Sequence, residues 1–339
     1  MPIKCGKCRS ADAEISLPYA RLSLCPECFL EYYVKRIERT VKKYRMFTDN
    51  EPVGVALSGG KDSAALLYGL RKAFPNQELS ALHVNLGIPE YSDHSQKKAE
   101  DAANLVGVKL YIFDLKREEG ISLSDFRETI FRRKICSVCG TIKRHAFEEL
   151  AHKAGVKVLA TGHNMDDILG FMLNNFFSGQ WSQLVRLKPV LPPLTHKMTR
   201  KIKPLIRTPE HENLLYCLYA EIPFREMNCP YSKGTKTRER LKMLETLSQG
   251  NPNFRHQALR SFLKLLPILE KSIKQPSVTP CMKCGFPSTS GTCAYCKRIA
   301  YLKELKTSRH AQQRIEKNCL FYTSPSPRDL STSRMPSSA

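Results

Sequence analysis

The chain has 339 residues, enough for one large α/β domain with small modules beside it. Its 54 Lys and Arg residues outnumber 32 Asp and Glu residues, and the formal net charge of +22 favours a polyanionic partner, nucleic acid more than membrane. No apolar run approaches the roughly 18 residues of a membrane span, and the first residues do not resemble a signal peptide, so we expect a cytoplasmic protein. A basic surface that is merely solvated is the alternative.

Thirteen cysteines in a reducing compartment do not indicate a disulfide framework, and their pairing in CxxC units points to metal. Residues 1–28 contain Cys5-x-x-Cys8 and Cys25-x-x-Cys28. Two such knuckles supply the four thiolates of a tetrahedral structural zinc site, without which so short a module could hardly fold. A redox pair is the weaker interpretation.

A basic helix is predicted from Glu27 to Phe47, within a connecting segment at residues 29–50. Apolar side chains recur on one face at helical spacing, while lysines and arginines cover the remaining surface. The basic face could contact RNA phosphate or could simply be solvated.

The stretch from Val53 to Ser63 reads VGVALSGGKDS and predicts a strand, a glycine turn and a helix. Such a turn directs free backbone N–H groups and the positive end of the helix dipole at one point, which suits a phosphate. A Walker A loop would need Gly in place of Val55 and Ser or Thr in place of Asp62, so that interpretation fails. A glycine-rich turn without a ligand is the alternative.

The turn SGGKDS instead resembles the PP-loop of the ATP pyrophosphatases, which grip the β- and γ-phosphates and cleave ATP between the α- and β-phosphates. The resemblance implies that ATP is bound by the residues of this turn, which are Ser58, Gly59, Gly60, Lys61, Asp62 and Ser63.

Strands and helices alternate after this turn. Strands are predicted at Leu79–Leu86, Val108–Leu115 and Val156–Thr161, and helices at Ser95–Val106, Thr141–Ala154 and Met165–Phe177. The pattern predicts an α/β fold, with a parallel twisted, Rossmann-like sheet covered by helices on both faces. We assign residues 51–274 to this domain and expect its ligands at the carboxyl ends of the strands.

The segment GHNMDD, from Gly162 to Asp167, lies at a second strand end. It resembles a segment of the ATP pyrophosphatases that modify tRNA, whose acids hold Mg²⁺ on the phosphates or orient the nucleotide. Paired carboxylates beside a triphosphate supply the oxygen ligands that Mg²⁺ requires. The alternative for Asp166 and Asp167 is negative charge at the start of the following helix.

A separate set of cysteines follows a different pattern. Cys136 and Cys139 form a CxxC pair just before the predicted helix start, and Cys229 stands far along the chain in NCPYS. Three thiolates without a fourth could hold a [4Fe–4S] cluster with one iron open, or could form a reactive persulfide pair. Another structural metal site is the remaining interpretation.

Two further basic stretches lie at residues 186–207 and 233–242, the second with Lys236, Arg238 and Arg240 close after Cys229. A tRNA backbone would lie on basic residues beside a sulfur centre. Residues 208–210 predict a helix start, and Cys217 on that helix is expected to be a buried core thiol.

The C-terminal part begins with a helix expected to end near Lys274, followed by a second zinc ribbon at residues 275–300 with ligands Cys281, Cys284, Cys293 and Cys296. The zinc modules could grip the RNA or hold the chain ends against the domain. Residues 301–318 form a basic tail. Residues 319–339 resemble the translation of a sequencing adapter, so we assign Cys319 no role.

Taken together, SGGKDS, CSVCGTIKR, GHNMDD, the NCPYS cysteine and the terminal knuckles resemble the archaeal and bacterial tRNA 2-thiouridine synthetases, kin to the eukaryotic cytoplasmic tRNA 2-thiolation protein. The resemblance spans nearly all of residues 1–300. It implies that Cys136, Cys139 and Cys229 hold the cluster, and that Lys143 and Asp167 act in catalysis.

The resemblance also places nucleotide contacts at Gly162, at Asp167, and at His83 and Val84 beside the adenosine, although His83 alone would be interpreted as a core residue. It implies ATP, Mg²⁺, one [4Fe–4S] cluster and two Zn²⁺ as cofactors. The uracil C2 oxygen would attack the α-phosphorus, and sulfur from a ubiquitin-like carrier or from sulfide would then displace AMP. Members are often dimeric.

Two other functions stay open at this point. Relatives that make 2-thiocytidine also carry a CxxC pair and a third cysteine, but they generally lack zinc knuckles at both ends, so the knuckles favour thiouridine. A non-catalytic zinc protein that binds RNA would have the same charge and the same terminal modules, but it would not convert ATP to AMP.

Overall fold

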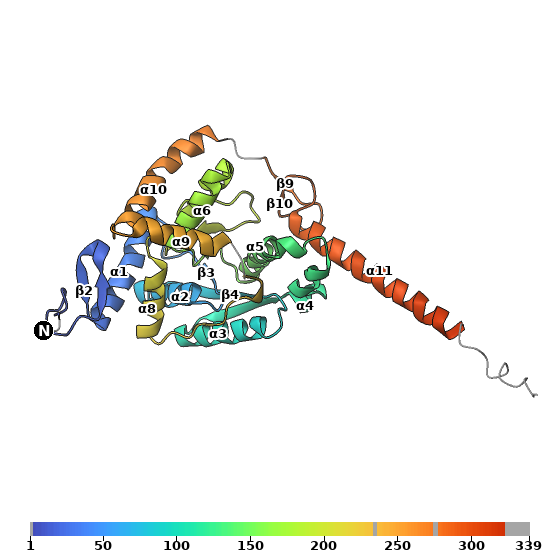
Figure 1. Ribbon diagram of the computed structural model, residues 1–339, viewed down its shortest axis with the longest axis horizontal. Helices are drawn as coiled ribbons and strands as arrows, with labels where there is room; N and C mark the ends of the chain where they lie inside the picture. Colours follow the sequence, from blue (N-terminus) through green and yellow to red (C-terminus); the bar gives the residue numbers. More distant parts are fainter. Residues whose placement is uncertain (1–2, 233–235, 274–276, 323–339) are drawn as a thin grey trace, which may run out of the picture.

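The computed structural model describes residues 3–232, 236–273 and 277–322, including the side chains of all but 236–241 and 309–322. A six-stranded sheet lies at its centre in the order β5-β4-β3-β6-β8-β7 (Figure 1). All neighbouring strands are parallel except β7, which runs antiparallel to β8 at one edge. The strands span Val53–Ala56 (β3), Leu79–Asn85 (β4), Lys109–Asp114 (β5), Val158–Ala160 (β6), Val190–Leu191 (β7) and Arg200–Ile202 (β8).

Helices cover both faces of this sheet, as expected for buried parallel strands. Alternate side chains of β4 show the two layers, because Leu79 and Ala81 pack with α1, α2, α3 and α8, whereas Leu82 and Val84 pack with α5. The helices around the sheet span Pro26–Tyr44 (α1), Lys61–Ala73 (α2), Tyr91–Val106 (α3), Leu115–Glu119 (α4), Ile135–Lys153 (α5), Met165–Phe177 (α6), Trp181–Val185 (α7), Glu210–Tyr219 (α8), Lys236–Ser248 (α9) and Phe254–Ser272 (α10). The predicted fold class is confirmed.

The N-terminal module consists of a short hairpin, β1 (Ile15–Leu17) and β2 (Leu22–Leu24), joined directly to α1. Helix α1 packs on α2 and α8 through apolar residues at the predicted spacing. Tyr33 stacks on Tyr216 with ring centroids 3.8 Å apart, and its hydroxyl donates to Asn213 Oδ1 at 2.7 Å. The module is therefore fixed to α8 through buried aromatic contacts.

The C-terminal module contains a small hairpin, β9 (Thr279–Pro280) and β10 (Pro287–Ser288), and the long helix α11 (Ala294–Tyr322). The first turns of α11 pack against α5, and the helix then extends away from the body (Figure 1). Residues 323–339, which make up most of the predicted adapter segment, lie outside the described residues.

Three details differ from the sequence prediction. Helix α3 begins at Tyr91 rather than at Ser95. Helix α5 begins at Ile135 rather than near Thr141, because Ile135, Val138 and Ile142 are all buried on one face and this packing outweighs the poor helix propensity of Gly140. Strands β7 and β8 lie in the proline-interrupted stretch at residues 186–207, where period-two apolar alternation is too short to be recognised. In the described ranges, no helix is long and apolar enough to cross a membrane.

Candidate active site

The glycine turn after β3 is closed by its own hydrogen bonds. The Ser58 amide donates to Ser63 Oγ at 3.1 Å, and the Ser63 hydroxyl donates to the Gly60 carbonyl at 2.9 Å. Gly59 has a φ of 76°, and a Cβ there would lie 2.3 Å from the Ser95 carbonyl oxygen, so only glycine fits. The turn leads directly into the first turn of α2, as the phosphate-loop prediction requires.

Two carboxylates hold the lysine of this turn. The Lys61 ammonium lies 2.6 Å from Glu210 Oε1 and 3.4 Å from Asp62 Oδ2. Asp62 Oδ1 also accepts hydrogen bonds from Asn164 at 3.0 Å and from Asn213 at 2.8 Å. The GHNMDD segment is thus bonded directly to SGGKDS.

Gly162 brings the same two segments together through backbone contact. A Cβ at Gly162 would lie 3.1 Å from backbone atoms of Asp62 and Ser63, so a larger residue would need the two segments to move apart by a few tenths of an ångström. The prediction that these segments form one site therefore agrees with the packing.

The paired aspartates have different surroundings. Asp166 is buried, accepts from the Glu210 amide at 2.7 Å and pairs with Arg255 Nε at 2.7 Å, so its carboxylate is used in the fold. Asp167 forms a capping box with Asn164, and burial followed by repulsion from Asp62 raises its pKa to about 7. Bound Mg²⁺ would relieve the repulsion between Asp62 and Asp167, so this pair of carboxylates fits a divalent cation.

A small cavity of about 20 Å³ lies at the end of the turn, and its lining includes Ser58, His83, Val84 and Lys143. His83 Nδ1 lies 2.8 Å from the Leu57 carbonyl oxygen, and burial lowers the pKa of the imidazole to about 4. Its Nε2 is buried without a partner among the described residues. His83 is therefore both the core residue that its sequence position indicates and a wall of this cavity.

Helix α5 brings the cysteine pair to the same edge. Cys136 Sγ lies 3.6 Å from the Tyr231 carbonyl oxygen, in the segment that carries Cys229. The pKa of the Cys139 thiol lies above its usual value. Burial is the main cause, Lys143 opposes the shift, and Cys229 and Cys136 add to it. Cys139 and Cys229 are half-buried against the same apolar cluster, and Cys136 is exposed to solvent. A cationic metal centre would relieve the mutual repulsion of three thiolates.

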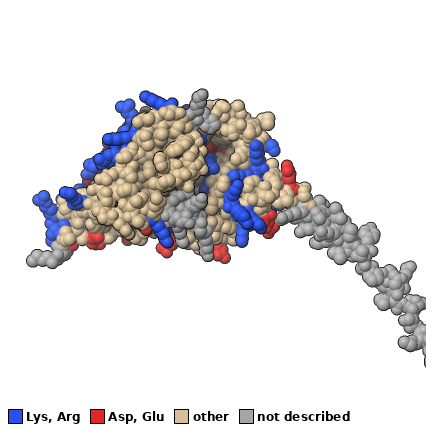
Figure 2. Space-filling model, turned by 45° about the horizontal axis from the view of Figure 1, so that its top comes forward, with Lys and Arg blue, Asp and Glu red and all other residues tan. Residues whose placement is uncertain are grey.

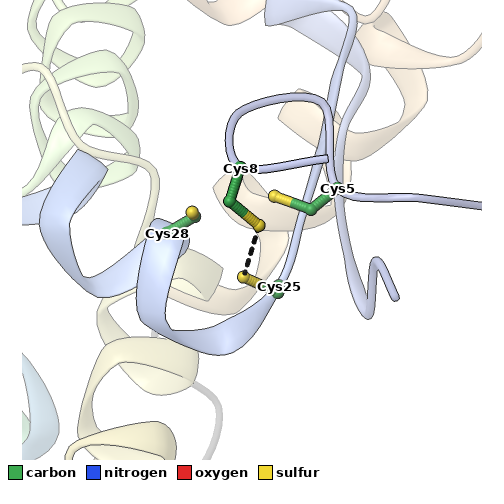
Figure 3. A group of neighbouring side chains, drawn as sticks. All are labelled: Cys5, Cys8, Cys25 and Cys28. Atoms are coloured by element: carbon green, nitrogen blue, oxygen red, sulfur yellow. Dashed lines mark hydrogen bonds between the residues drawn. The ribbon is translucent and has the colours of Figure 1, made fainter. Parts of the chain in front are cut away.

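The two four-cysteine sets are more compact than this trio. In the part of the chain that the structure describes, the groups of potential ligands within 4.8 Å of one another are these two sets. Cys8 and Cys25 lie 3.9 Å apart (Figure 3), and Cys284 and Cys293 lie 3.6 Å apart. Four thiolates on one zinc ion at about 2.3 Å would be roughly 3.8 Å apart, so both sets fit zinc. Thiolates on separate irons of a cluster would be farther apart.

One arginine that the sequence did not single out links the two halves of the site. The Arg225 amide donates to the Gly59 carbonyl at 2.7 Å, and its guanidinium donates to Ser95 Oγ at 2.7 Å. The guanidinium also stacks on Tyr91, 4.2 Å from the ring centroid. Arg225 precedes Cys229 on the same segment, and no motif marks it. The side chains of Lys236, Arg238 and Arg240 lie outside the described residues.

The PP-loop domain family matches residues 31–242, and the family of the N-terminal LIM domain of the 2-thiouridine synthetase TtuA matches residues 4–30. The tRNA-5-methyluridine(54) 2-sulfurtransferase of Pyrococcus horikoshii is 35% identical over 89% of this chain and 96% of its own length. The chain belongs to the family of PP-loop tRNA 2-sulfurtransferases.

Other relatives agree with this assignment. The Thermotoga maritima tRNA-5-methyluridine(54) 2-sulfurtransferase is 32% identical over 91% of this chain and its whole length. The solved U34-tRNA thiolase NcsA of Methanococcus maripaludis, with its [4Fe-4S] cluster, superimposes with a TM-score of 0.74 at 28% identity, covering 88% of this chain and 95% of that one. The resemblance inferred from the motifs is thereby confirmed.

Proposed function

We propose that this tRNA sulfurtransferase replaces the C2 oxygen of a tRNA uridine with sulfur, using ATP to activate that oxygen. One observation carries the proposal. Lys143 and Ser58 both line the cavity at the glycine turn, residues 58–63, which we call the ATP turn. Lys143 stands one helical turn after Cys139 on α5. Because a cavity of about 20 Å³ has room for about one water molecule, the base would lie at its mouth beside Lys143, between the nucleotide phosphates and the cysteine trio.

In the first step, the uracil C2 oxygen would attack the α-phosphorus and pyrophosphate would leave. The backbone amides of Gly59 and Gly60 and the Lys61 ammonium would bind the departing phosphates. Lys143 would stabilise negative charge that develops at the α-phosphate. Asp62 and Asp167 would hold Mg²⁺, which neutralises phosphate charge.

In the second step, a sulfur nucleophile would attack C2 and AMP would leave with the original oxygen. Cys136, Cys139 and Cys229 fit a [4Fe–4S] cluster with one open iron because they are three thiols and none of them is fully buried. When bound, the cluster would supply an open iron for the sulfur. Lys143 would also favour the thiolate form of Cys139, against the burial that raises the pKa of this thiol. The four-cysteine sets would each hold one structural zinc ion.

The modified position proposed is uridine 54. Three relatives that are 35%, 32% and 34% identical to this chain are named for 5-methyluridine 54. The U34 thiolase is less similar, at 28% identity. The sulfur would come from a carrier thiocarboxylate or from sulfide, and a homodimer in the cytoplasm remains our expectation.

The test uses anaerobically prepared protein, ATP, sulfide and an unmodified tRNA transcript, with AMP and thiolated nucleoside measured together. Lys143→Ala should lose thiolation while tRNA binding persists, and Lys153→Ala, at the far end of the same helix, should retain both. Equal activity of both variants would contradict the proposed site. Transcripts that carry cytidine at position 54 or 34 identify the modified uridine, and we expect only the first to abolish AMP formation.

A further inference from the structure

A second cavity, of about 480 Å³, lies between α5, the chain around β7 and β8, and the C-terminal zinc module. Four cationic side chains contribute to its lining, and they come from three separate parts of the chain. They are Arg144, Arg186, Lys201 and Lys297. Serine and threonine residues of the zinc module also line the cavity, among them Ser290 and Thr292.

The two arginines carry charge that the fold does not neutralise. Lys201 pairs with Glu148 at 2.5 Å, and Lys297 donates to Ser290 Oγ at 2.7 Å. Within the described ranges, no carboxylate lies within 4.0 Å of the guanidinium of Arg144 or Arg186. Desolvation, followed by the charges of Arg186 and Arg298, lowers the pKa of Arg144. Like charges gathered around one cavity favour an anionic ligand there.

The position of the cavity suggests which anion it binds. Thr141 and Arg144 line the cavity from α5, two and five residues after Cys139 on that helix. An anion in the cavity would therefore lie close to the cysteine trio. Guanidinium and hydroxyl groups together are typical contacts to the phosphates and sugars of a nucleic acid.

We propose that this cavity binds the phosphate backbone of the RNA substrate and holds the target uridine at the cysteine trio. This inference rests on the proposed function. Figure 2 shows Lys and Arg side chains beside a hollow to the right of the centre of the molecule, with several Asp and Glu side chains nearby. The formal net charge of +22 fits an extended polyanion better than a small one.

The test compares Arg186→Gln and Arg144→Gln with Lys72→Gln. Lys72 is exposed in the last turn of α2, at the opposite end of that helix from the ATP turn, so the control removes one positive charge elsewhere. Binding of an unmodified tRNA transcript is measured over a series of salt concentrations. Each cavity variant should bind roughly tenfold more weakly near 0.1 M salt, with a salt slope shallower by about one.

Zinc content and the unfolding midpoint check that each variant is folded, and Arg186→Gln decides the question if Arg144→Gln does not fold. Unchanged tRNA affinity in Arg186→Gln would overturn the proposal and leave an acidic protein as the partner of this cavity. An equal loss in Lys72→Gln would overturn it too, because the effect would then be one of net charge. If the wild-type protein fails to bind tRNA, the proposed function fails as well.

Discussion

The four-cysteine sets and the cysteine trio use the same side chain and the same CxxC spacing, but they differ in how the fold presents them. In each set, two knuckles converge and their sulfurs lie within 4.8 Å of one another. In the trio, one pair lies in the first turns of α5 and the third thiol arrives from a distant segment, with Cys136 exposed. Four converging thiols match the closed structural zinc site that we propose for each set, and three thiols match the open reactive site that we propose for the trio.

The largest expected effect would come from opening a closed set. Cys5→Ser removes one of four ligands, and structural zinc contributes about 10–16 kcal/mol of apparent binding free energy in small modules. Soluble yield should fall sharply and zinc content should drop from two ions to one, as measured by metal analysis. Cys217→Ser is the matched control, because that buried thiol belongs to neither kind of site. Normal zinc in Cys5→Ser would remove the distinction between closed and open sites.

The ATP turn should be separable from both kinds of cysteine site. Lys61→Ala removes the cation between Asp62 and Glu210, and AMP formation should fall by about 10²–10³-fold. Metal content should not change, and the cost in stability should stay near 1 kcal/mol because the lost ion pairs are partly exposed. Undiminished AMP formation would refute the ATP assignment.

Arg225 joins the ATP turn to the segment of Cys229, so its removal tests whether the open site depends on that link. In Arg225→Ala, KM for ATP should rise by about tenfold, since hydrogen bonds to a charged group contribute about 1.5–3 kcal/mol and part of this is retained by the backbone contact. Arg225→Lys should restore part of the loss. Steady-state AMP assays decide the matter, and an unchanged KM would show the contact to be incidental.

The smallest effect concerns a contact between a closed module and the open site. Arg298 of α11 donates to the Ser137 carbonyl at 2.8 Å and to Ser137 Oγ at 3.1 Å, between the two cysteines of α5. Arg298→Ala should lower stability by about 1 kcal/mol and speed the loss of iron in air, with zinc unchanged. Iron loss at the wild-type rate would mean that the zinc module does not support the trio.

Two of the motifs predicted the ATP part of this site because each follows a strand, and the carboxyl ends of parallel strands meet at one edge. SGGKDS and GHNMDD, far apart in the sequence, are joined through Asp62 and Asn164. Contacts between distant segments without a motif could not be predicted. Glu210 contacts Lys61, and Arg225 contacts the glycine turn. The sequence around Glu210 or Arg225 gives no indication of either contact.

The central claim is that the trio holds an open metal centre for sulfur while the two sets are closed around zinc. The most direct test is iron, sulfide and zinc analysis of anaerobically purified wild-type protein and of Cys229→Ser. We predict about four irons and two zincs per chain in the wild type, and in the variant the iron lost with both zincs retained. Zinc without iron in the wild type, even after anaerobic reconstitution, would contradict the account and leave the trio as a persulfide or structural site.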